Sequence, residues 1–252
     1  MSDYKIWEHC DSYGEFLYNR SIGEIEEMEA SKVLCDILKP IYKPGMKVLD
    51  VGCATGHYLR SFRNRLDKDI YYTGVDNTPS YISKAEKAFS GARFFVEDIH
   101  SINFRDNSFD IVVCNNLIMH LPPPPIKAIT ELIRVSSKYT VIRTPVGKRN
   151  YIIREVKDHY DDLDIEDKKN LTTLINEDGE PQYWNYLNLY TKEFIEDIIL
   201  KVNPDYNITF IDDNPKELGT KIKSKTATEV VDGKQVCGNI VLDWKFIVVE
   251  KC

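Results

Sequence analysis

Acidic residues and small-residue turns occur together at the ends of short apolar runs. In VLDVGCATG, residues 48–56, Asp50 lies near the end of such a run, and Gly52, Ala54 and Gly56 follow it. Glycine tolerates close approach and unusual backbone angles, so a ligand can lie against this turn. A carboxylate here would repel a pyrophosphate and attract a positively charged ligand. The alternative is a structural turn in which the acid caps the next helix.

Two further acids end the next two apolar runs. Asp76 stands 24 residues after Gly52, near the spacing at which dinucleotide-binding folds use an acid to hold ribose hydroxyls. Because Asn-Thr-Pro follows it, Asp76 is also a candidate turn or N-cap residue. Asp98 can accept a hydrogen bond from an exocyclic amine, and Ile99 can lie against a purine face. Together the three acids predict a pocket for a nucleoside with a cationic tail.

These acids need a scaffold that brings strand ends together. Apolar runs predict strands over residues 47–51, 70–75, 92–96, 109–114 and 139–143. Helical patterns lie between them over residues 58–65, 80–89 and 126–135. This alternation is typical of a doubly wound α/β fold with a mostly parallel sheet, whose ligands bind at the carboxyl ends of the strands.

The two ends of the chain depart from the alternation. Strand-like runs at 207–213 and 239–251 have only a short stretch at 215–222 and a possible VDGK hairpin turn between them, so they can lie antiparallel at a sheet edge. We divide a single predicted domain into a helical lid (1–44), a cofactor-binding core (45–146), a charged, aromatic and irregular substrate-covering insertion (147–190), and the rest of the core (191–252).

Composition limits the class of protein. A chain of 252 residues with 42% apolar residues can build one sizeable core, and its net charge of −7 disfavours nucleic acid as a partner. The six cysteines lack metal or C-x-x-C spacing, so we expect reduced thiols in a cytoplasmic protein and no metal site. Neither a signal peptide nor a membrane span is evident, which predicts a soluble protein without a membrane partner. The oligomeric state is not indicated.

The motifs together resemble those of class I S-adenosylmethionine-dependent methyltransferases, in the branch that acts on small molecules. VLDVGCATG is similar to the family's first motif, GVD to its second acidic position, VEDI to its adenine motif, and FDIVVCNNLIMHLP to its fourth strand and loop. The likeness implies a Rossmann-like, mostly parallel seven-stranded sheet with an antiparallel last strand. Ala54 replaces a common glycine and VSSKY replaces LKPGG before the fifth strand. Neither change opposes cofactor binding.

The same resemblance implies S-adenosylmethionine as the cofactor and S-adenosylhomocysteine as its product. The implied cofactor-binding residues are those of the turn, of the two later strand ends and of the fourth strand, together with one lid residue: Asp50, Gly52, Cys53, Ala54, Gly56, Asp76, Asn77, Asp98, Ile99, Asn115 and Tyr18. Tyr13, Tyr18 and Arg20 lie in a segment similar to the N-terminal helices of small-molecule methyltransferases. They would reach the cofactor carboxylate or close over it, unless that helix only packs its aromatic face on the core.

A sulfonium methyl is already activated, so its transfer to oxygen or nitrogen mainly requires the two reactants to be held close and aligned. His120, in the loop after the fourth strand, is the candidate general base, because imidazole takes up protons near neutral pH. The alternative is that His120 only packs or forms hydrogen bonds within its loop.

The acceptor side is predicted from basic and aromatic residues after the fifth strand. The candidates are Arg143, Tyr151, Tyr183 and Trp184, with Lys148, Arg149 and Tyr186 nearby. Such a cluster suits an anionic or sugar-like small molecule, although the charges could be solvated and the aromatics could be core. We expect a sugar, a nucleotide-linked sugar or a phosphorylated metabolite of bacterial surface-glycan (capsule) biosynthesis.

Other functions remain open at this point. An NAD-dependent Rossmann oxidoreductase would share the strand, turn and later acid, but it expects G-x-G-x-x-G. A non-catalytic S-adenosylmethionine-binding module would share every binding motif. Methylation of a protein is excluded by no residue.

Overall fold

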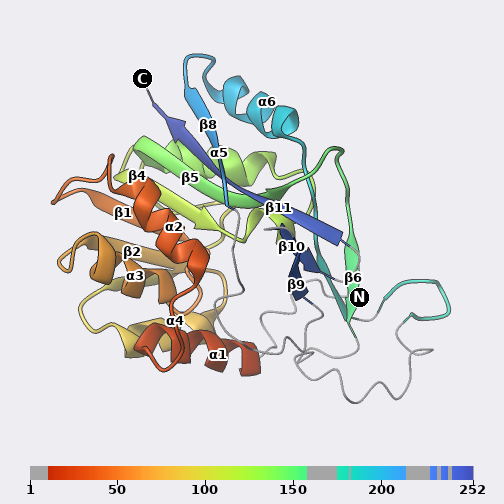
Figure 1. The fold of residues 1–252 in the computed structure, drawn as a ribbon, viewed down its shortest axis with the longest axis horizontal. Coiled ribbons are helices and arrows are strands. Elements are labelled where there is room, and N and C mark those ends of the chain that lie inside the picture. Colours follow the sequence, from red (N-terminus) through yellow and green to blue (C-terminus); the bar gives the residue numbers. More distant parts are fainter. Residues whose placement is uncertain are drawn as a thin grey trace.

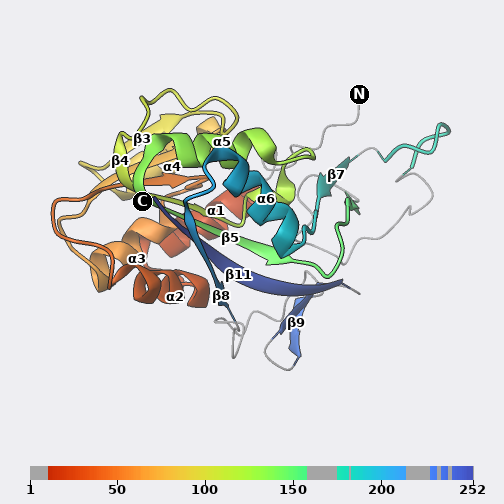
Figure 2. The same ribbon diagram turned by 90° about the horizontal axis from the view of Figure 1, so that it is seen from above.

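A central twisted sheet is covered by helices on both faces (Figure 1, Figure 2). The computed structural model describes residues 11–157, 175–181, 183–213, 228–231, 234–237 and 240–251. The short stretch at 215–222 lies outside the described residues. In the described part of the chain, no helix has both the length and the apolar character needed to cross a membrane.

The described strands form the doubly wound sheet that was expected. Its order is β3-β2-β1-β4-β5-β11-β10-β9, with β8 also paired to β11. The strands of the parallel part are β1 (Lys47–Val51), β2 (Tyr71–Asp76), β3 (Arg93–Val96), β4 (Phe109–Asn115) and β5 (Ser136–Val146). The antiparallel part consists of β8 (Asn207–Asp212), β9 (Thr228–Val231), β10 (Lys234–Cys237) and β11 (Ile240–Glu250). The reversed last strand is confirmed.

The sheet is larger than the seven strands expected, because nine strands are described in it. β9 and β10 form a hairpin in which Lys234 pairs with Val231, at the position of the VDGK turn. β10 pairs with the first residues of β11, whereas β8 pairs with β11 from Lys245 onward. A long β11 therefore has different partners along its length.

Two buried clusters occupy the two faces of the sheet. The helices are α1 (Asp11–Ile22), α2 (Glu29–Leu38), α3 (His57–Arg65), α4 (Pro79–Ala88), α5 (Ile126–Val135) and α6 (Lys192–Val202). Side chains of α2, α3 and α4 belong to one cluster, and those of α5 and α6 belong to the other. Because strand residues alternate, Val48 and Asp50 face the first cluster, while Leu49 and Val51 face the second.

Two features of the fold were not predicted. α6 begins after Thr191, whose Oγ1 accepts a hydrogen bond from the Phe194 N–H at 3.2 Å. Region 147–190, expected to be irregular, contains an antiparallel pair formed by β6 (Arg154–Lys157) and β7 (Tyr183–Tyr186). These partners are far apart in sequence, so no hairpin turn signals the pairing.

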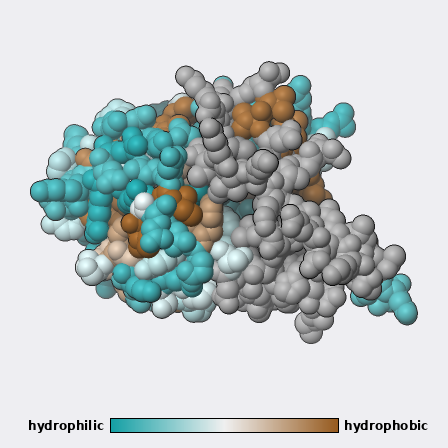
Figure 3. All heavy atoms as spheres, turned by 60° about the horizontal axis from the view of Figure 1, so that its bottom comes forward, coloured by the Kyte–Doolittle hydropathy of each residue, from teal (hydrophilic) through white to brown (hydrophobic). Residues whose placement is uncertain are grey.

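The surface and the thiols agree with the composition. On the face shown in Figure 3, hydrophilic side chains of the described residues surround small hydrophobic areas. Cys35, Cys53 and Cys114 are free and buried. Burial raises the pKa of Cys35 to about 12, so its thiol stays protonated.

Candidate functional site

The turn after β1 is built from left-handed backbone positions. Gly52 and Gly56 have φ angles of +77° and +79°, and Ala54 has +49°. Only glycine adopts these angles without steric cost, so Ala54 is held there by its surroundings. The N–H groups of Gly52 and Cys53 donate to the Val75 carbonyl at 2.8 and 3.0 Å, while the Cys53 side chain is fully buried. The turn is thereby tied to the end of β2.

Asp76 fastens the same turn from the side. Its Oδ2 accepts a hydrogen bond from the Ala54 N–H at 3.0 Å, and its Oδ1 accepts one from the Thr78 N–H at 2.9 Å. Burial raises the pKa of Asp76, against the lowering effect of these hydrogen bonds. The next residue, Asn77, is exposed. The predicted ribose acid thus also holds the turn that would lie under the ligand.

Asp50 is a buried acid at this edge. Asp50 is only 1% exposed. Its Oδ2 accepts a hydrogen bond from Tyr72 Oη at 2.8 Å. Burial raises the pKa of Asp50 to about 7, opposed by the Tyr72 hydrogen bond and aided by the Asp76 charge. A positively charged group bound nearby would favour the ionised carboxylate.

The third predicted acid has a different environment. Asp98 is exposed, and its Oδ1 accepts a hydrogen bond from the His100 N–H and lies 2.8 Å from His100 Nδ1. Ile99, expected to lie against a purine, is buried in the cluster with α5 and α6. The structure therefore brings Asp98 to the end of β3 on a solvent-facing turn, next to a core isoleucine.

The N-terminal helices are fastened over the turn. Ser21 Oγ in α1 lies 2.8 Å from Thr55 Oγ1 and 2.9 Å from the Thr55 carbonyl. Arg60 Nη1 in α3 donates to the carbonyls of Arg20 and Ile25 at 3.0 and 2.8 Å. These contacts hold the end of α1 against residues 55 and 60.

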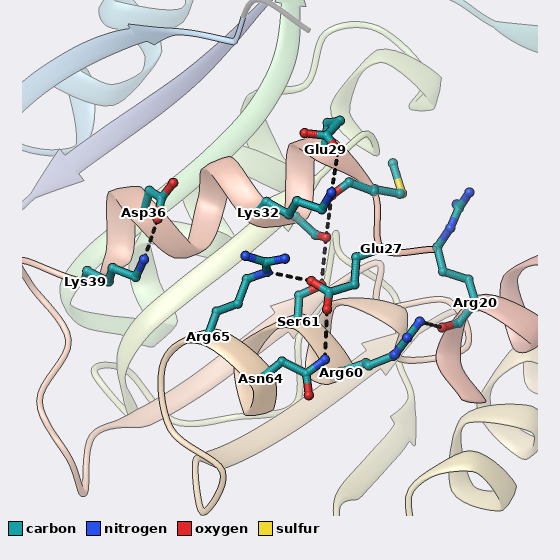
Figure 4. Close-up of polar contacts among 12 residues, drawn as sticks. Arg20, Glu27, Glu29, Lys32, Asp36, Lys39, Arg60, Ser61, Asn64 and Arg65 are labelled. Carbon is teal, nitrogen blue, oxygen red and sulfur yellow. Dashed lines mark hydrogen bonds and ion pairs between the residues drawn. The ribbon is translucent and has the colours of Figure 1, made fainter. Parts of the chain in front are cut away.

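Figure 4 shows a second set of contacts between the α1–α2 connection and α3. Glu27 accepts hydrogen bonds from Arg65 Nε at 2.7 Å and Asn64 Nδ2 at 2.8 Å. At the start of α2, Ser31 Oγ lies 2.8 Å from Ser61 Oγ. The position of α1 over the turn is therefore set by several polar contacts.

Two of the three lid residues considered from sequence, Arg20 and Tyr18, lie in different places. The Arg20 guanidinium is buried and stacks over the Phe16 ring, with Cζ 4.6 Å from the ring centroid. The Tyr18 ring is instead beside α4, where Lys87 Nζ lies 5.2 Å from its centroid. Burial and the Arg20 charge lower the pKa of His57 to about 3, so His57 is a neutral imidazole at the start of α3.

The end of β4 forms the opposite wall of the site. Asn115 is buried, and neither its Oδ1 nor its Nδ2 has a hydrogen-bond partner among the described residues. Leu117 lies directly against the glycine turn, since a Cβ added to Gly52 would come within 2.8 Å of Leu117 Cδ2. Leu117 was missed from sequence because an apolar loop residue carries no chemical signal.

His120 ends a short 3-10 helix, η2 (Ile118–His120), after this wall. Its Nδ1 lies 2.7 Å from the Tyr186 carbonyl oxygen, which can only accept, so Nδ1 carries the hydrogen. In the neutral ring the lone pair is then on Nε2, as a proton acceptor requires. Asn188 holds the two segments together, through its N–H to the Met119 carbonyl at 2.8 Å and its Nδ2 to the Leu121 carbonyl at 2.9 Å.

Arg143, predicted to contact the acceptor, is paired within the chain. Its Nη2 and Nε lie 2.5 and 2.6 Å from Asp213 Oδ2, and both side chains are buried. Nη1 donates to Asn116 Oδ1, and Cζ lies 3.9 Å from the Trp244 ring centroid. The guanidinium therefore joins β5, the loop after β4 and the end of β8.

The other acceptor candidates do not form one cluster. Tyr151 is 47% exposed, and its N–H donates to the Leu189 carbonyl at 2.7 Å. Trp184 is buried in β7, with Arg154 Cζ 4.7 Å from its ring centroid. The side chain of Tyr183 lies outside the described part of the structure. The described residues contain no group of three or more His, Cys, Asp or Glu side chains arranged for a metal.

Comparison with protein families identifies the domain. A model for the methyltransferase domain matches residues 42–180, more than half of the chain, from before β1 to beyond β6. The chain belongs to the methyltransferase-domain family. The match includes the glycine turn, Asp76, Asn115 and His120.

Relatives of this methyltransferase domain resemble it over part of their length. The chain is 32% identical over 122 residues to phosphoethanolamine N-methyltransferase 3 of Arabidopsis thaliana, an alignment that covers 45% of this chain and 24% of the plant protein. It therefore spans about a quarter of that relative's length.

Solved structures agree in fold. A possible histamine N-methyltransferase of Thermotoga maritima aligns with a TM-score of 0.56 at 14% identity, covering 99% of this chain and 100% of the other. The magnesium protoporphyrin IX methyltransferase of Synechocystis, solved with bound S-adenosylhomocysteine, aligns with a TM-score of 0.54 at 12% identity, covering 89% and 83%. At these identities the likeness concerns the fold.

S-adenosylmethionine is the cofactor of this methyltransferase domain, and the residues present fit it. The buried Asn115 amide has both an unpaired donor and an unpaired acceptor for a polar ligand group, as counted over the described residues. Asp50 would be ionised by a cationic ligand. Asp76 and Asp98 would hold the ribose and the adenine.

Proposed function

We propose that this protein transfers a methyl group from S-adenosylmethionine to an oxygen or nitrogen atom of a small-molecule acceptor. The single observation that carries the proposal is the turn of residues 52–56. Asp76 clamps it from β2 and α1 covers it through Ser21. At the adjacent strand end lies the Asn115 amide, which has no partner in the described part of the chain.

When bound, the cofactor supplies an activated methyl group on a sulfonium. The residues of this chain then have two tasks, to align the acceptor and to accept its proton where the acceptor is a hydroxyl. His120 suits the second task because its Nδ1 donates to the Tyr186 carbonyl, which leaves Nε2 as the basic nitrogen. The predicted roles of the four chain segments, with 1–44 as a lid and 147–190 as a substrate cover, belong to the same proposal.

The class of acceptor is proposed from the relatives and the charges. Similarity to a phosphoethanolamine N-methyltransferase supports a small phosphorylated metabolite, which was among the predicted acceptors. Exposed Lys148 and Arg149 follow β5 and could pair with such an anion at the entrance. The relatives described above do not support the surface-glycan sugar, so that part of the expectation and the cytoplasmic location remain sequence predictions.

Calorimetry and a turnover assay test the proposal. We expect S-adenosylhomocysteine to bind in the micromolar range and NADH not to bind; the reverse would support the oxidoreductase alternative. S-adenosylhomocysteine formation is then measured with phosphoethanolamine, ethanolamine, hexose phosphates and nucleotide-linked sugars as acceptors. Binding without turnover of any of these would favour the non-catalytic module.

A further inference from the structure

A buried asparagine holds the loop that carries His120. Asn188 is fully buried. Its N–H donates to the Met119 carbonyl at 2.8 Å, and its Nδ2 donates to the Leu121 carbonyl at 2.9 Å. These two carbonyls belong to the residues immediately before and after His120. Asn188 therefore fixes the backbone on both sides of the candidate base.

The ring of His120 is held by the same stretch of chain. Its Nδ1 donates to the carbonyl of Tyr186, two residues before Asn188, and that carbonyl also accepts a hydrogen bond from Asn185 Nδ2 at 3.1 Å. An imidazole that uses Nδ1–H in this way has its lone pair on Nε2, which is the atom that a general base needs. One segment, residues 185–188, thus fixes both the backbone and the ring.

A second segment supports the 185–188 segment in turn. The Ile153 N–H donates to Asn188 Oδ1 at 3.3 Å, and the Leu187 N–H donates to the Ile153 carbonyl at 3.0 Å. Tyr151 and Leu189 donate to each other's carbonyls at 2.7 and 2.9 Å. The contacts of Asn188 therefore belong to a pair of hydrogen-bonded chain segments and not to an isolated loop.

The packing between η2 and this pair of segments is apolar. The buried side chains form one cluster: Met119, Leu187, Leu189, Leu242 and Trp244. In such surroundings a buried polar group without its partner costs about 1–3 kcal/mol. A shift of η2 would separate the Asn188 amide from the carbonyls that it binds, so the observed position of His120 is favoured over its alternatives.

The orienting groups lie outside the part of the chain that the methyltransferase-domain model matches. That match ends at residue 180, so it includes His120 but neither Tyr186 nor Asn188. The candidate base therefore belongs to the matched domain, while the groups that orient it follow that domain in the chain.

We propose that Asn188 is a positioning residue for methyl transfer. By holding the carbonyls of Met119 and Leu121, it places His120 so that the Tyr186 carbonyl takes the Nδ1–H and Nε2 is left to accept the proton of the methyl acceptor. This inference rests on the proposed methyltransferase function, in which His120 is the general base. It gives the 147–190 region a second role, the orientation of that base.

The state of the His120 ring can be measured without any methyl acceptor. In protein labelled with ¹⁵N at histidine, NMR distinguishes a protonated ring nitrogen from a bare one, and His120→Asn identifies the signals of His120. At about pH 8.5, where an ordinary imidazole is neutral, we expect wild-type His120 to be the Nδ1–H tautomer. An Nε2–H tautomer in the wild type overturns the proposal, whether or not any variant folds.

Asn188→Ala tests the positioning residue, with Asn150→Ala as the matched control. Asn150 Oδ1 accepts a hydrogen bond from the Thr191 N–H at 2.8 Å, so the control loses a side-chain to backbone contact that does not involve η2. We expect both tautomers of His120 in Asn188→Ala and the wild-type spectrum in Asn150→Ala. A folded Asn188→Ala in which His120 stays entirely Nδ1–H overturns the proposal. If this variant does not fold, Asn188→Ser is measured and interpreted in the same way.

Turnover provides the second readout, with whichever acceptor of the panel is methylated. Asn188→Ala should lower kcat about 10–100-fold because the base is misplaced, while the KM for acceptor and the Kd for S-adenosylhomocysteine stay within about twofold of the wild type. A wild-type kcat in Asn188→Ala overturns the positioning role. If no acceptor is methylated, the tautomer result alone decides. Failure to bind S-adenosylhomocysteine would instead contradict the proposed function, and the tautomer result would still stand.

Discussion

The carboxyl edge of the sheet has two halves that hold their polar groups in different ways. In the cofactor half, residues 52–56 and Asp76, most polar contacts are to backbone groups, and the Asp76 carboxylate accepts from two N–H groups. In the acceptor half, His120 and Arg143, the contacts are side-chain bonds to distant segments. Arg143 and Asp213 are 70 residues apart, and His120 and Tyr186 are 66 apart.

The two regions also differ in which hydrogen-bond partners are missing before a ligand binds. The cofactor half is closed by its own hydrogen bonds, so it is preformed for its ligand. Between the two halves, the Asn115 amide has no hydrogen-bond partner within the described residues. We infer that ligand binding completes the hydrogen bonds of Asn115, whereas it only occupies the glycine turn.

Breaking the Arg143–Asp213 pair should have the largest effect. Arg143→Met leaves Asp213 buried without its partner, and we expect a loss of about 3–5 kcal/mol in the free energy of unfolding. Urea denaturation monitored by fluorescence measures it. The double variant Arg143→Met/Asp213→Asn should recover much of that loss, because no buried charge remains unpaired. A loss below about 1 kcal/mol in the single variant would mean that the pair is solvated.

Substitution of His120 separates chemistry from loop positioning. His120→Ala should lower turnover about 10²-fold or more if the imidazole accepts the acceptor's proton, without changing the affinity for S-adenosylhomocysteine. His120→Asn is the matched control, because its amide can still donate to the Tyr186 carbonyl but cannot take up a proton. Wild-type turnover in His120→Asn would assign His120 a positioning role only.

Asp76 and Asp98 should contribute differently to the affinity for the cofactor. Asp76→Ala removes an acceptor for two backbone N–H groups as well as the expected ribose contact. The Kd of this variant for S-adenosylhomocysteine should therefore be about 30–100-fold higher than that of the wild type. Asp98→Ala changes an exposed carboxylate and should raise the Kd less, about tenfold or below. Isothermal titration calorimetry compares the two. Equal losses would contradict the clamping role of Asp76.

The same contrast explains what sequence could and could not predict. The glycine turn, Asp50 and Asp76 were predictable because each lies at the end of a local apolar run, and local runs identify strands. Arg143 was expected to face the acceptor, since sequence gives no sign of Asp213 as its partner. Leu117 was not identified, because its importance depends on its packing against Gly52.

The buried carboxyl group of Asp50 should make the stability of the protein depend on pH. Its pKa in the folded protein is raised to about 7 from an ordinary value of 3.8, so the fold favours the neutral acid. The unfolded chain loses this proton at lower pH, and the stability should therefore fall as the pH rises between about 4 and 7. Asp50→Asn should remove this decline, measured as the difference between the two urea-denaturation profiles.

Cofactor binding should depend on pH in the opposite sense, by a smaller factor. If the bound cationic cofactor requires the Asp50 carboxylate, binding below pH 7 includes the cost of removing the proton of Asp50. The Kd for S-adenosylmethionine should then be about tenfold weaker at pH 6 than at pH 8. Tyr72→Phe removes the hydrogen bond that Tyr72 Oη donates to Asp50 Oδ2, and it should move this dependence to higher pH. Asp50→Asn should flatten the profile. A wild-type profile that is already flat would mean that Asp50 stays protonated beside the ligand, and the charge attraction predicted for this turn would then come from other groups.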